Sequence, residues 1–376
     1  MGKKQDLIMR IVLDTNIICA DFLMKGNAFR IFLSGVPRVG VTVYIPEVVV
    51  DEVLNKYKQA LLEAVRSFDN VSKLWHRITE NKLKLFEEAL DIENQISWYR
   101  EYLQEKIKNI GAKVVAYPDI SHKEMVRRSL EGKPPFRSDG KGYRDSIIWQ
   151  SILTLCSKDK GKIYFVTNNS RDFGEGPQLQ NDLAQDLVRG GHPVDNVTVV
   201  SSLEKLNSEL ILPHLKRLDD MIDRFSRDAV SEFSLQGWVE SNLKDELNDQ
   251  EWGSSLLGID PSHAHARVRI NRIISVEVDD VRQLQSGDIL LAATTGLEME
   301  VDIDGDPEKY YQYDDVQAFW GAEPTDNSSA LVPVTGKIAF TIMLEKKSLD
   351  VLSVEIDNID SDFVTIQVNS HIRKPA

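Results

Sequence analysis

Four acidic side chains lie where short apolar runs give way to polar residues. Asp14 and Asp172 follow expected strands, Asp145 begins an expected helix, and Glu52 lies about one turn into another helix. In a parallel sheet, the loops that follow the strands meet at one edge, so these carboxylates are expected to converge there. Carboxylates this close repel one another unless a cation lies among them. The spacing therefore predicts a metal site.

The oxygen-only character of the predicted ligands indicates which metal it would be. Carboxylate oxygens without His or Cys favour Mg²⁺ or Mn²⁺ over Zn²⁺. A pair of such ions can activate a water molecule and stabilise the leaving oxygen of a phosphodiester. The predicted chemistry is hydrolysis of a phosphodiester bond.

Three of these acidic residues also have a purely structural interpretation. Asp14 could cap the helix that follows it, Asp145 could interact with a helix dipole, and Asp172 could hold a loop together.

A run of basic residues leads directly into Asp145. A nucleic-acid-binding surface is expected from Lys123, Arg127, Arg128, Lys133, Arg137, Lys141 and Arg144. Phe136 and Tyr143 could stack on the bases of a single strand. The alternative is an ordinary solvated surface, which is the usual role of a charged run.

The elements that must position these residues alternate between strand and helix, which implies a mostly parallel sheet wrapped by helices. We expect strands at 10–16, 39–45, 113–118, 162–167 and 197–200, and helices at 17–34, 48–66, 122–130, 144–155 and 181–189, with a helical hairpin at 70–110.

The second half of the chain has a different pattern of residues. Residues 202–249 are expected to be helical, and residues 253–261 form a linker. Short β-rich runs follow at 266–278, 288–294, 297–303, 331–344, 351–356 and 363–368. They predict a small antiparallel sandwich or barrel. The expected domains are an α/β domain at 1–205 with a helical insertion at 67–137, a helical connector and linker at 206–261, and an acidic all-β domain at 262–376.

The net charge of −14 is unevenly distributed. Residues 1–200 hold 29 basic and 26 acidic side chains, whereas residues 201–376 hold 16 and 33. A uniformly acidic chain would be a poor candidate for binding nucleic acid, but the near-neutral first half is not. The acidic half could lie against the basic run and restrain the site. No stretch approaches the roughly 20 apolar residues of a membrane span, so no membrane partner is expected.

The two cysteines, Cys19 and Cys156, both lie in apolar runs. They cannot form a Cys-based zinc site, and buried free thiols are the expected state. This favours a reducing compartment, the cytoplasm.

The acidic motifs together resemble those of the PIN-domain nucleases, which include the VapC-type bacterial toxins. The resemblance covers about residues 10–200. It rests on Ile-Val-Leu-Asp-Thr-Asn at 11–16, on Glu52, on Asp145 after a Gly-rich loop, and on Val-Thr-Asn-Asn-Ser-Arg-Asp-Phe at 166–173.

The resemblance implies an acidic quartet that binds Mg²⁺ or Mn²⁺ and cuts RNA. Asp14, Glu52 and Asp145 match its first three positions. Asn169 stands where many members carry the fourth acid, and Asp172 is the acidic residue available nearby. Thr167, at the exit of a strand, would position a carboxylate or a water.

The resulting expectation is a metal-dependent endoribonuclease of the cytoplasm, acting as a toxin or defence effector regulated by its C-terminal domain. A protein partner is expected on that domain, and the resemblance suggests a homodimer. The preference for RNA over DNA rests on the resemblance alone. A non-catalytic PIN-like scaffold that binds RNA or protein, and a nuclease for single-stranded DNA, remain alternatives.

Overall fold

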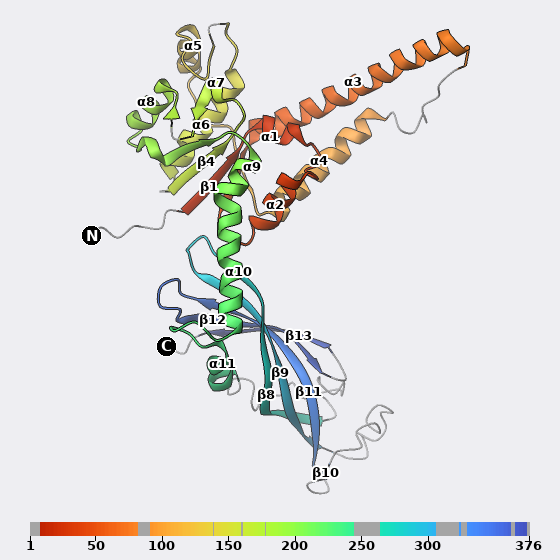
Figure 1. Cartoon of the computed structure of the whole chain (residues 1–376), viewed down its shortest axis with the longest axis vertical. Coiled ribbons are helices and arrows are strands. Elements are labelled where there is room, and N and C mark those ends of the chain that lie inside the picture. The colour runs from red at the N-terminus through yellow and green to blue at the C-terminus, as the bar shows by residue number, and fades with distance from the viewer. Residues whose placement is uncertain are drawn as a thin grey trace. The chain divides into compact units, whose positions relative to one another are not determined.

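The chain forms two compact units. A computed structural model describes residues 8–81, 91–137, 139–158, 161–176, 178–243, 264–305, 323–324, 329–361 and 365–373. The units are Met1–Leu215 and Lys216–Ala376, and the division falls within helix α10 (Leu212–Ser226). Each unit is built on its own sheet (Figure 1).

The first unit has a parallel sheet of five strands in the order β3-β2-β1-β4-β7, which confirms the predicted α/β class. The strands are β1 (Ile8–Leu13), β2 (Thr42–Pro46), β3 (Lys113–Val115), β4 (Gly161–Val166) and β7 (Val197–Val200). The central strands read as nearly continuous apolar runs because both faces of the sheet are covered. Ile11, Val12 and Phe165 are completely buried.

Helices surround this sheet. They are α1 (Thr15–Ala20), α2 (Asn27–Gly35), α3 (Glu47–Thr79), α4 (Ile92–Asn109), α5 (His122–Leu130), α6 (Tyr143–Lys158), α7 (Ser170–Phe173), α8 (Asn181–Arg189) and α9 (Leu203–Leu206). Smaller elements are the two-stranded β5 (Gly174–Glu175) and β6 (Gln178–Leu179), the 3₁₀ turn η2 (Val194–Asn196) and the π-helical segment η3 (Asn207–Ile211).

The single helix expected at 17–34 is instead divided into α1 and α2. Met24, between them, has a φ of 50°. A residue in this left-handed region interrupts a right-handed helix. The Asp21 carboxylate then accepts a hydrogen bond from the Gly26 N–H at 2.7 Å, just before α2 begins.

Helix α3 is longer than expected. The sequence predicted a helix that ends near Arg66 and a separate hairpin, but α3 runs unbroken for 33 residues and α4 packs beside it (Figure 1). No Gly or Pro interrupts α3. Tyr57 of α3 stacks on Tyr99 of α4, with ring centroids 3.9 Å apart. Trp75 of α3 and Trp98 of α4 are 46% and 45% exposed.

The second unit has an antiparallel sheet, as expected, with the strand order β13-β12-β11-β9-β8 and β10 paired to β11. Its elements are α11 (Leu235–Trp238), η4 (Val239–Leu243), β8 (Ala264–Gln283), β9 (Ile289–Gly305), β10 (Glu323–Pro324), β11 (Ser329–Leu344), β12 (Val351–Ser361) and β13 (Thr365–Arg373). The linker expected at 253–261 lies outside the described residues.

The described strands of this unit form one open sheet rather than the expected sandwich or barrel, since β8 and β13 are its two edges. Two runs predicted as separate strands, 288–294 and 297–303, form the single strand β9, which pairs with β8 and β11 along its length. The inward residues of β11 alternate along the strand, and Trp238 of α11 lies 6.4 Å from Phe340 between ring centroids. A helix therefore covers one face of the sheet.

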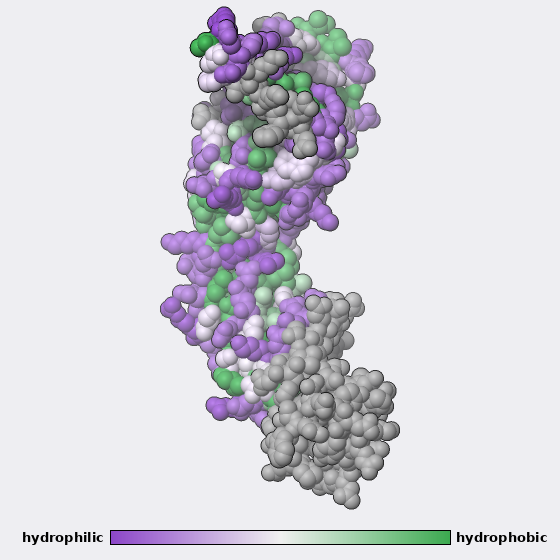
Figure 2. Space-filling view, turned by 90° about the vertical axis from the view of Figure 1, so that its right-hand side faces the viewer, coloured by the Kyte–Doolittle hydropathy of each residue, from purple (hydrophilic) through white to green (hydrophobic). Residues whose placement is uncertain are grey.

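Hydrophilic residues dominate the described surface seen in Figure 2, with hydrophobic residues interspersed among them. None of the described helices combines the length and the apolar character that crossing a membrane requires.

Candidate active site

Asp14 and Thr167 lie side by side because of the register of β1 and β4. Leu13 pairs with Val166 in the sheet, so the next residue of each strand reaches the same edge. The Asp14 N–H donates to the carbonyl oxygen of Val166 at 3.0 Å. The Thr167 hydroxyl donates to Asp14 Oδ2 at 2.5 Å. Both residues are buried, at 2% and 0% exposure.

The Thr167 hydroxyl is the centre of a small hydrogen-bond network. It accepts hydrogen bonds from Asn16 Nδ2 at 3.1 Å and from the Asn169 N–H at 3.0 Å. Asn16 Nδ2 also donates to Asp14 Oδ2 at 2.6 Å, and the Thr15 N–H donates to Asp14 Oδ1 at 2.7 Å. Asp14 is therefore the N-cap of α1, as its structural interpretation predicted, and it is also part of this cluster.

The carboxyl group of Asp14 is buried away from water. Burial raises its pKa from 3.8 to about 7, and the charges of Asp145 and Glu52 act in the same direction. Hydrogen bonds from the Thr167 hydroxyl and the Thr15 N–H oppose this rise because they stabilise the ionised form.

Asp145 comes from the first turn of α6. Burial raises its pKa to about 6, and the charges of Asp172 and Glu52 raise it further, while Arg137 and Arg144 lower it. None of the described residues donates a hydrogen bond to the Asp145 carboxylate. Asp145 therefore lies among carboxylates from three other segments.

Glu52 reaches the site from the second turn of α3. Its Oε2 accepts a hydrogen bond from the Thr15 hydroxyl at 3.0 Å, and its Oε1 lies 2.6 Å from Arg144 Nη1. The Glu52 side chain is 13% exposed and that of Arg144 is 54% exposed. The ion pair therefore joins α3 to the start of α6 at the surface of the site.

Asp172, in α7, is buried and is held by two partners. Arg137 forms an ion pair with both of its carboxylate oxygens. Asn169 Nδ2 donates to Asp172 Oδ2 at 2.9 Å. The two candidates for the fourth position, Asn169 and Asp172, are thus neighbours, and the acid is the buried one of the pair.

The chemistry of this donor set suits a hard divalent cation. Its ligands are carboxylate oxygens, and the raised pKa values of Asp14 and Asp145 indicate negative charge that a cation would offset. As the described side chains stand, no three acidic, His or Cys groups converge on one point. Glu52 and Asp172 are instead held by Arg144 and Arg137. A metal at this site would compete with these arginines for the carboxylates.

The basic run does not form the uniform surface that the sequence suggested. Six of its seven members pair with acids: Arg127 with Glu124, Arg128 with Asp186, Lys133 with Glu131, Arg137 with Asp172, Lys141 with Asp139 and Arg144 with Glu52. Lys123 is exposed on α5. Only Arg137 and Arg144 contact acids of the candidate site.

Arg128 is a correction to the predicted binding surface. Its side chain is 5% exposed, and its Nη2 lies 2.8 Å from Asp186 Oδ2. The same guanidinium donates to the Pro134 carbonyl oxygen at 2.8 Å. Phe136 is also buried, at 4% exposure, so it does not present a stacking surface, whereas Tyr143 is 49% exposed. Arg128 and Phe136 belong to the interior of the unit.

Sequence reasoning missed the positioning role of Asn16 and Thr15. Asn16 bridges Asp14 and Thr167, and its Oδ1 accepts from the Asn168 N–H at 3.2 Å. The signal was present as a polar Asp-Thr-Asn run directly after a buried strand. Only the strand register shows which side chain each residue of the run contacts.

Replacing Thr167 with Val tests the network. Val is nearly isosteric, but it removes the donor to Asp14 and the acceptor for Asn16 and Asn169. We expect a loss of about 10- to 100-fold in Mn²⁺ affinity, the usual effect of losing a group that orients a ligand, measured by titration calorimetry. Thr167→Ser keeps the hydroxyl and should retain most of the affinity. Wild-type Mn²⁺ affinity in the Val variant would contradict this role.

Comparison with known families agrees with the geometry. Residues 11–173 match the family model of the PIN domain, and this segment begins in β1 and ends with α7, so it contains all four acidic residues of the site. No curated protein sequence matches the chain. PIN domains are generally nucleases, which supports a nuclease activity in general. The first unit of this chain therefore contains a PIN domain, which extends over residues 11–173.

Proposed function

We propose that this chain is a divalent-metal-dependent endoribonuclease that hydrolyses phosphodiester bonds in RNA. The observation that carries the proposal is that Asp14, Glu52 and Asp145, from three distant segments, lie near enough to one another for their charges to interact. Burial and mutual repulsion raise the pKa values of Asp14 and Asp145 to about 7 and 6. Such strongly perturbed acids are typical of functional sites.

The metal would be Mg²⁺ or Mn²⁺, held by Asp14, Glu52, Asp145 and Asp172. When bound, such ions supply an activated water and stabilise the charge that develops on the leaving oxygen. Thr167 and Asn16 fix the orientation of the Asp14 carboxylate, and Asn169 fixes that of Asp172.

Arg137 and Arg144 are the basic residues best placed to bind the substrate. Each pairs with an acid of the site, and each guanidinium can form paired hydrogen bonds to phosphate oxygens. We infer that the two arginines hold Asp172 and Glu52 in the metal-free protein and bind the phosphodiester once the carboxylates bind metal. Lys123, Arg127, Lys133 and Lys141 would add weaker, screened attraction for the strand.

Substituting Arg137 with Gln is expected to change two affinities in opposite directions. The apparent Kd for Mn²⁺ should fall by about three- to tenfold, because a positive charge that competes for Asp172 is removed. The affinity for a short RNA should decrease, because a phosphate partner is lost. Arg127→Gln removes an exposed arginine from a similar ion pair outside the site and serves as the matched control. Calorimetry and fluorescence anisotropy measure the two effects, and unchanged Mn²⁺ affinity in Arg137→Gln would contradict the competition.

The proposal also covers the substrate, the biological role, the oligomeric state and the compartment. RNA rather than DNA is proposed as the substrate because of the resemblance to PIN nucleases. A role as a toxin or defence effector regulated by the second unit, with a protein partner there, rests on the added domain and its excess of acid. A homodimer is proposed on the resemblance, and the cytoplasm on the unpaired thiols of Cys19 and Cys156.

A cleavage assay separates this proposal from its alternatives. Labelled single-stranded RNA and DNA of the same sequence, and a circular RNA, are incubated with Mn²⁺ or EDTA. Cleavage of linear and circular RNA in Mn²⁺ alone supports the endoribonuclease. Cleavage of DNA alone identifies a single-stranded DNA nuclease. RNA binding without cleavage of either polymer identifies a non-catalytic scaffold.

A further inference from the structure

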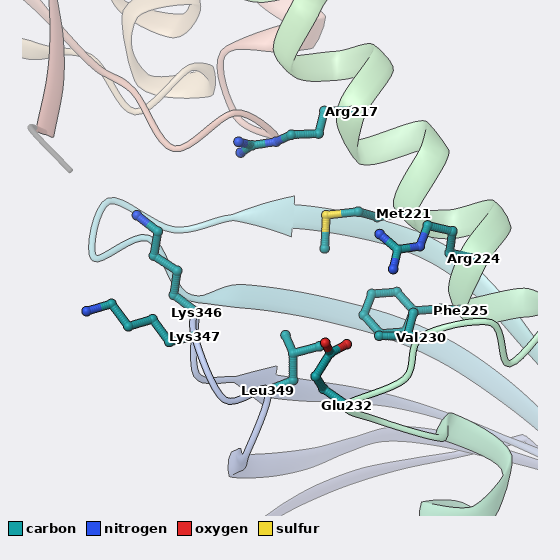
Figure 3. Close-up of a pocket in the computed structure, with 9 residues that line it drawn as sticks. All are labelled: Arg217, Met221, Arg224, Phe225, Val230, Glu232, Lys346, Lys347 and Leu349. Atoms are coloured by element: carbon teal, nitrogen blue, oxygen red, sulfur yellow. The ribbon is translucent and has the colours of Figure 1, made fainter. Parts of the chain in front are cut away.

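The second unit has a pocket of about 340 Å³, which is far from the candidate active site in sequence and is built entirely from that unit (Figure 3). Its wall comes from α10, from the segment after α10 and from the turn between β11 and β12. The lining residues are Arg217, Met221, Arg224, Phe225, Val230, Glu232, Lys346, Lys347 and Leu349. This volume is at the lower end of the range for small-molecule sites.

The charge of the pocket is opposite to that of its unit. Residues 216–376 contain 15 basic and 31 acidic side chains, yet four of the basic ones and a single acid line this pocket. Among the residues that the structure describes, Arg224 and Lys347 form no hydrogen bond or ion pair, although the charge of Arg224 helps to lower the pKa of Glu232. Arg217 donates to the side-chain oxygen of Gln283, a neutral partner that leaves its charge uncompensated. The pocket is therefore a local anion-attracting position in an otherwise acidic unit.

Between the cationic groups lies an apolar surface. Figure 3 shows the two arginines extending from α10 and the two lysines from the turn after β11, with Met221, Phe225 and Leu349 between them. Phe225 is 3% exposed and packs edge-on against Phe233, with ring centroids 6.1 Å apart. A pocket of this kind suits a ligand that has an apolar body as well as a charge.

The backbone at Leu349 is an independent observation. Leu349 has a φ of 57°, which is an outlier for a bulky residue. The turn holds it there through the Leu349 N–H, which donates to the Glu345 carbonyl oxygen at 2.9 Å. Strained positions of this type tend to occur where a side chain has a function, such as lining a binding site. The turn thus places an apolar side chain in the wall of the pocket.

We propose that this pocket binds a small organic phosphate, with an apolar or aromatic body lying against Met221 and Leu349 and the phosphate held by Arg224 and Lys347. Lys347 extends away from Arg224 in Figure 3, so its exposed side chain turns toward Arg224 when the ligand binds. Glu232 weakens the attraction for any anion. This site is separate from the proposed nuclease site, and it gives the second unit a ligand of its own.

The test uses the full chain in EDTA, with 1-naphthyl phosphate as the probe. The chain has seven methionines, so ¹³C-methyl labelling gives few signals, and Met221→Leu identifies the one from the pocket. We expect the Met221 signal to shift saturably, with a Kd on the order of 100 µM for a ligand of this size. Inorganic phosphate, 1-naphthol and 1-naphthoate should each bind at least about tenfold more weakly, the effect of losing one good interaction.

Three variants locate the contacts. Arg224→Ala and Lys347→Ala, both of exposed side chains, should each weaken binding of the probe by about tenfold. Glu232→Gln should strengthen it. Arg227→Ala, directly after α10 and paired with Asp223 outside the pocket, is the matched control and should leave binding unchanged.

Several results would overturn the proposal. These are a Met221 signal that does not shift, an unchanged Kd in Arg224→Ala and Lys347→Ala, and an equal loss in Arg227→Ala, which would indicate only general attraction by charge. Equal binding of 1-naphthoate would overturn the assignment of a phosphate.

Discussion

Asp145→Asn should lower Mn²⁺-dependent cleavage by about 10³-fold, the order of loss seen when one charged member of a catalytic group is removed. Asp145 is the cleanest of the four acids to replace because the described residues donate no hydrogen bond to its carboxylate. Asp14→Asn is less suitable, since an amide N–H at position 14 would face donors from Thr15, Asn16 or Thr167.

The same substitution should stabilise the fold above pH 6. Burial, with the charges of Asp172 and Glu52, raises the pKa of Asp145 from 3.8 to about 6, so between these values the folded protein binds more protons than the unfolded chain. The contribution of Asp145 to stability is therefore present below pH 4 and is lost as the pH rises to 6. Asn carries no charge and avoids this loss, which is at most about 3 kcal/mol.

Urea denaturation in EDTA at pH 4 and pH 8 measures the effect. The variant should gain stability relative to the wild type only at pH 8. Asp139→Asn, an exposed acid of the preceding loop, is the control for cleavage and should leave it unchanged. Wild-type cleavage by Asp145→Asn would remove Asp145 from the proposed site, and cleavage that persists in EDTA would contradict the metal requirement.

Asp186→Leu should lower the free energy of unfolding of the first unit by about 3–5 kcal/mol. Asp186 of α8 accepts hydrogen bonds from Arg128 Nη1 at 3.0 Å and from Trp149 Nε1 at 3.1 Å. The Arg128 and Asp186 side chains are only 5% and 9% exposed. The substitution leaves a buried guanidinium without its counter-charge, and removing one partner of a buried ion pair destabilises a protein more than replacing both.

The double variant Arg128→Met with Asp186→Leu should recover much of the lost stability, because it leaves no unpaired charge. Glu124→Ala breaks the exposed ion pair with Arg127, one residue from Arg128, and should cost less than about 1 kcal/mol. Denaturant unfolding followed by tryptophan fluorescence measures all three variants. If Asp186→Leu costs no more than Glu124→Ala, the network does not stabilise the unit.

Much of the fold could be predicted because its elements have clear local signals. The helices α5 and α8 and the strand β7 have the predicted bounds, since apolar periodicity and flanking polar or Gly residues mark both ends of each. The break at Met24 could not be predicted, because nothing in the local sequence requires Met to adopt a left-handed conformation. The boundaries proposed for the three domains, at 1–205, 206–261 and 262–376, remain a prediction.

The candidate site shows the same division between local and long-range information. The sequence placed Asp14 and Asp145 at strand or helix ends, and the structure brings them near Glu52. The sequence could not assign partners to the basic residues. A run of Lys and Arg looks the same in the sequence whether a side chain is exposed, as in Lys123, or buried, as in Arg128. Long side chains find their partners through tertiary structure.

Only the first part of α3 is buried in the unit, and this part carries Glu52. The buried residues of this 33-residue helix are Val48, Val49, Val53 and Leu54, all within two turns of Glu52, and every later residue is at least partly exposed. The far part of the helix is thus a modular extension, and natural selection can lengthen, shorten or redecorate it without moving the carboxylate. New partners could therefore bind the far part of α3 without a change in the position of Glu52.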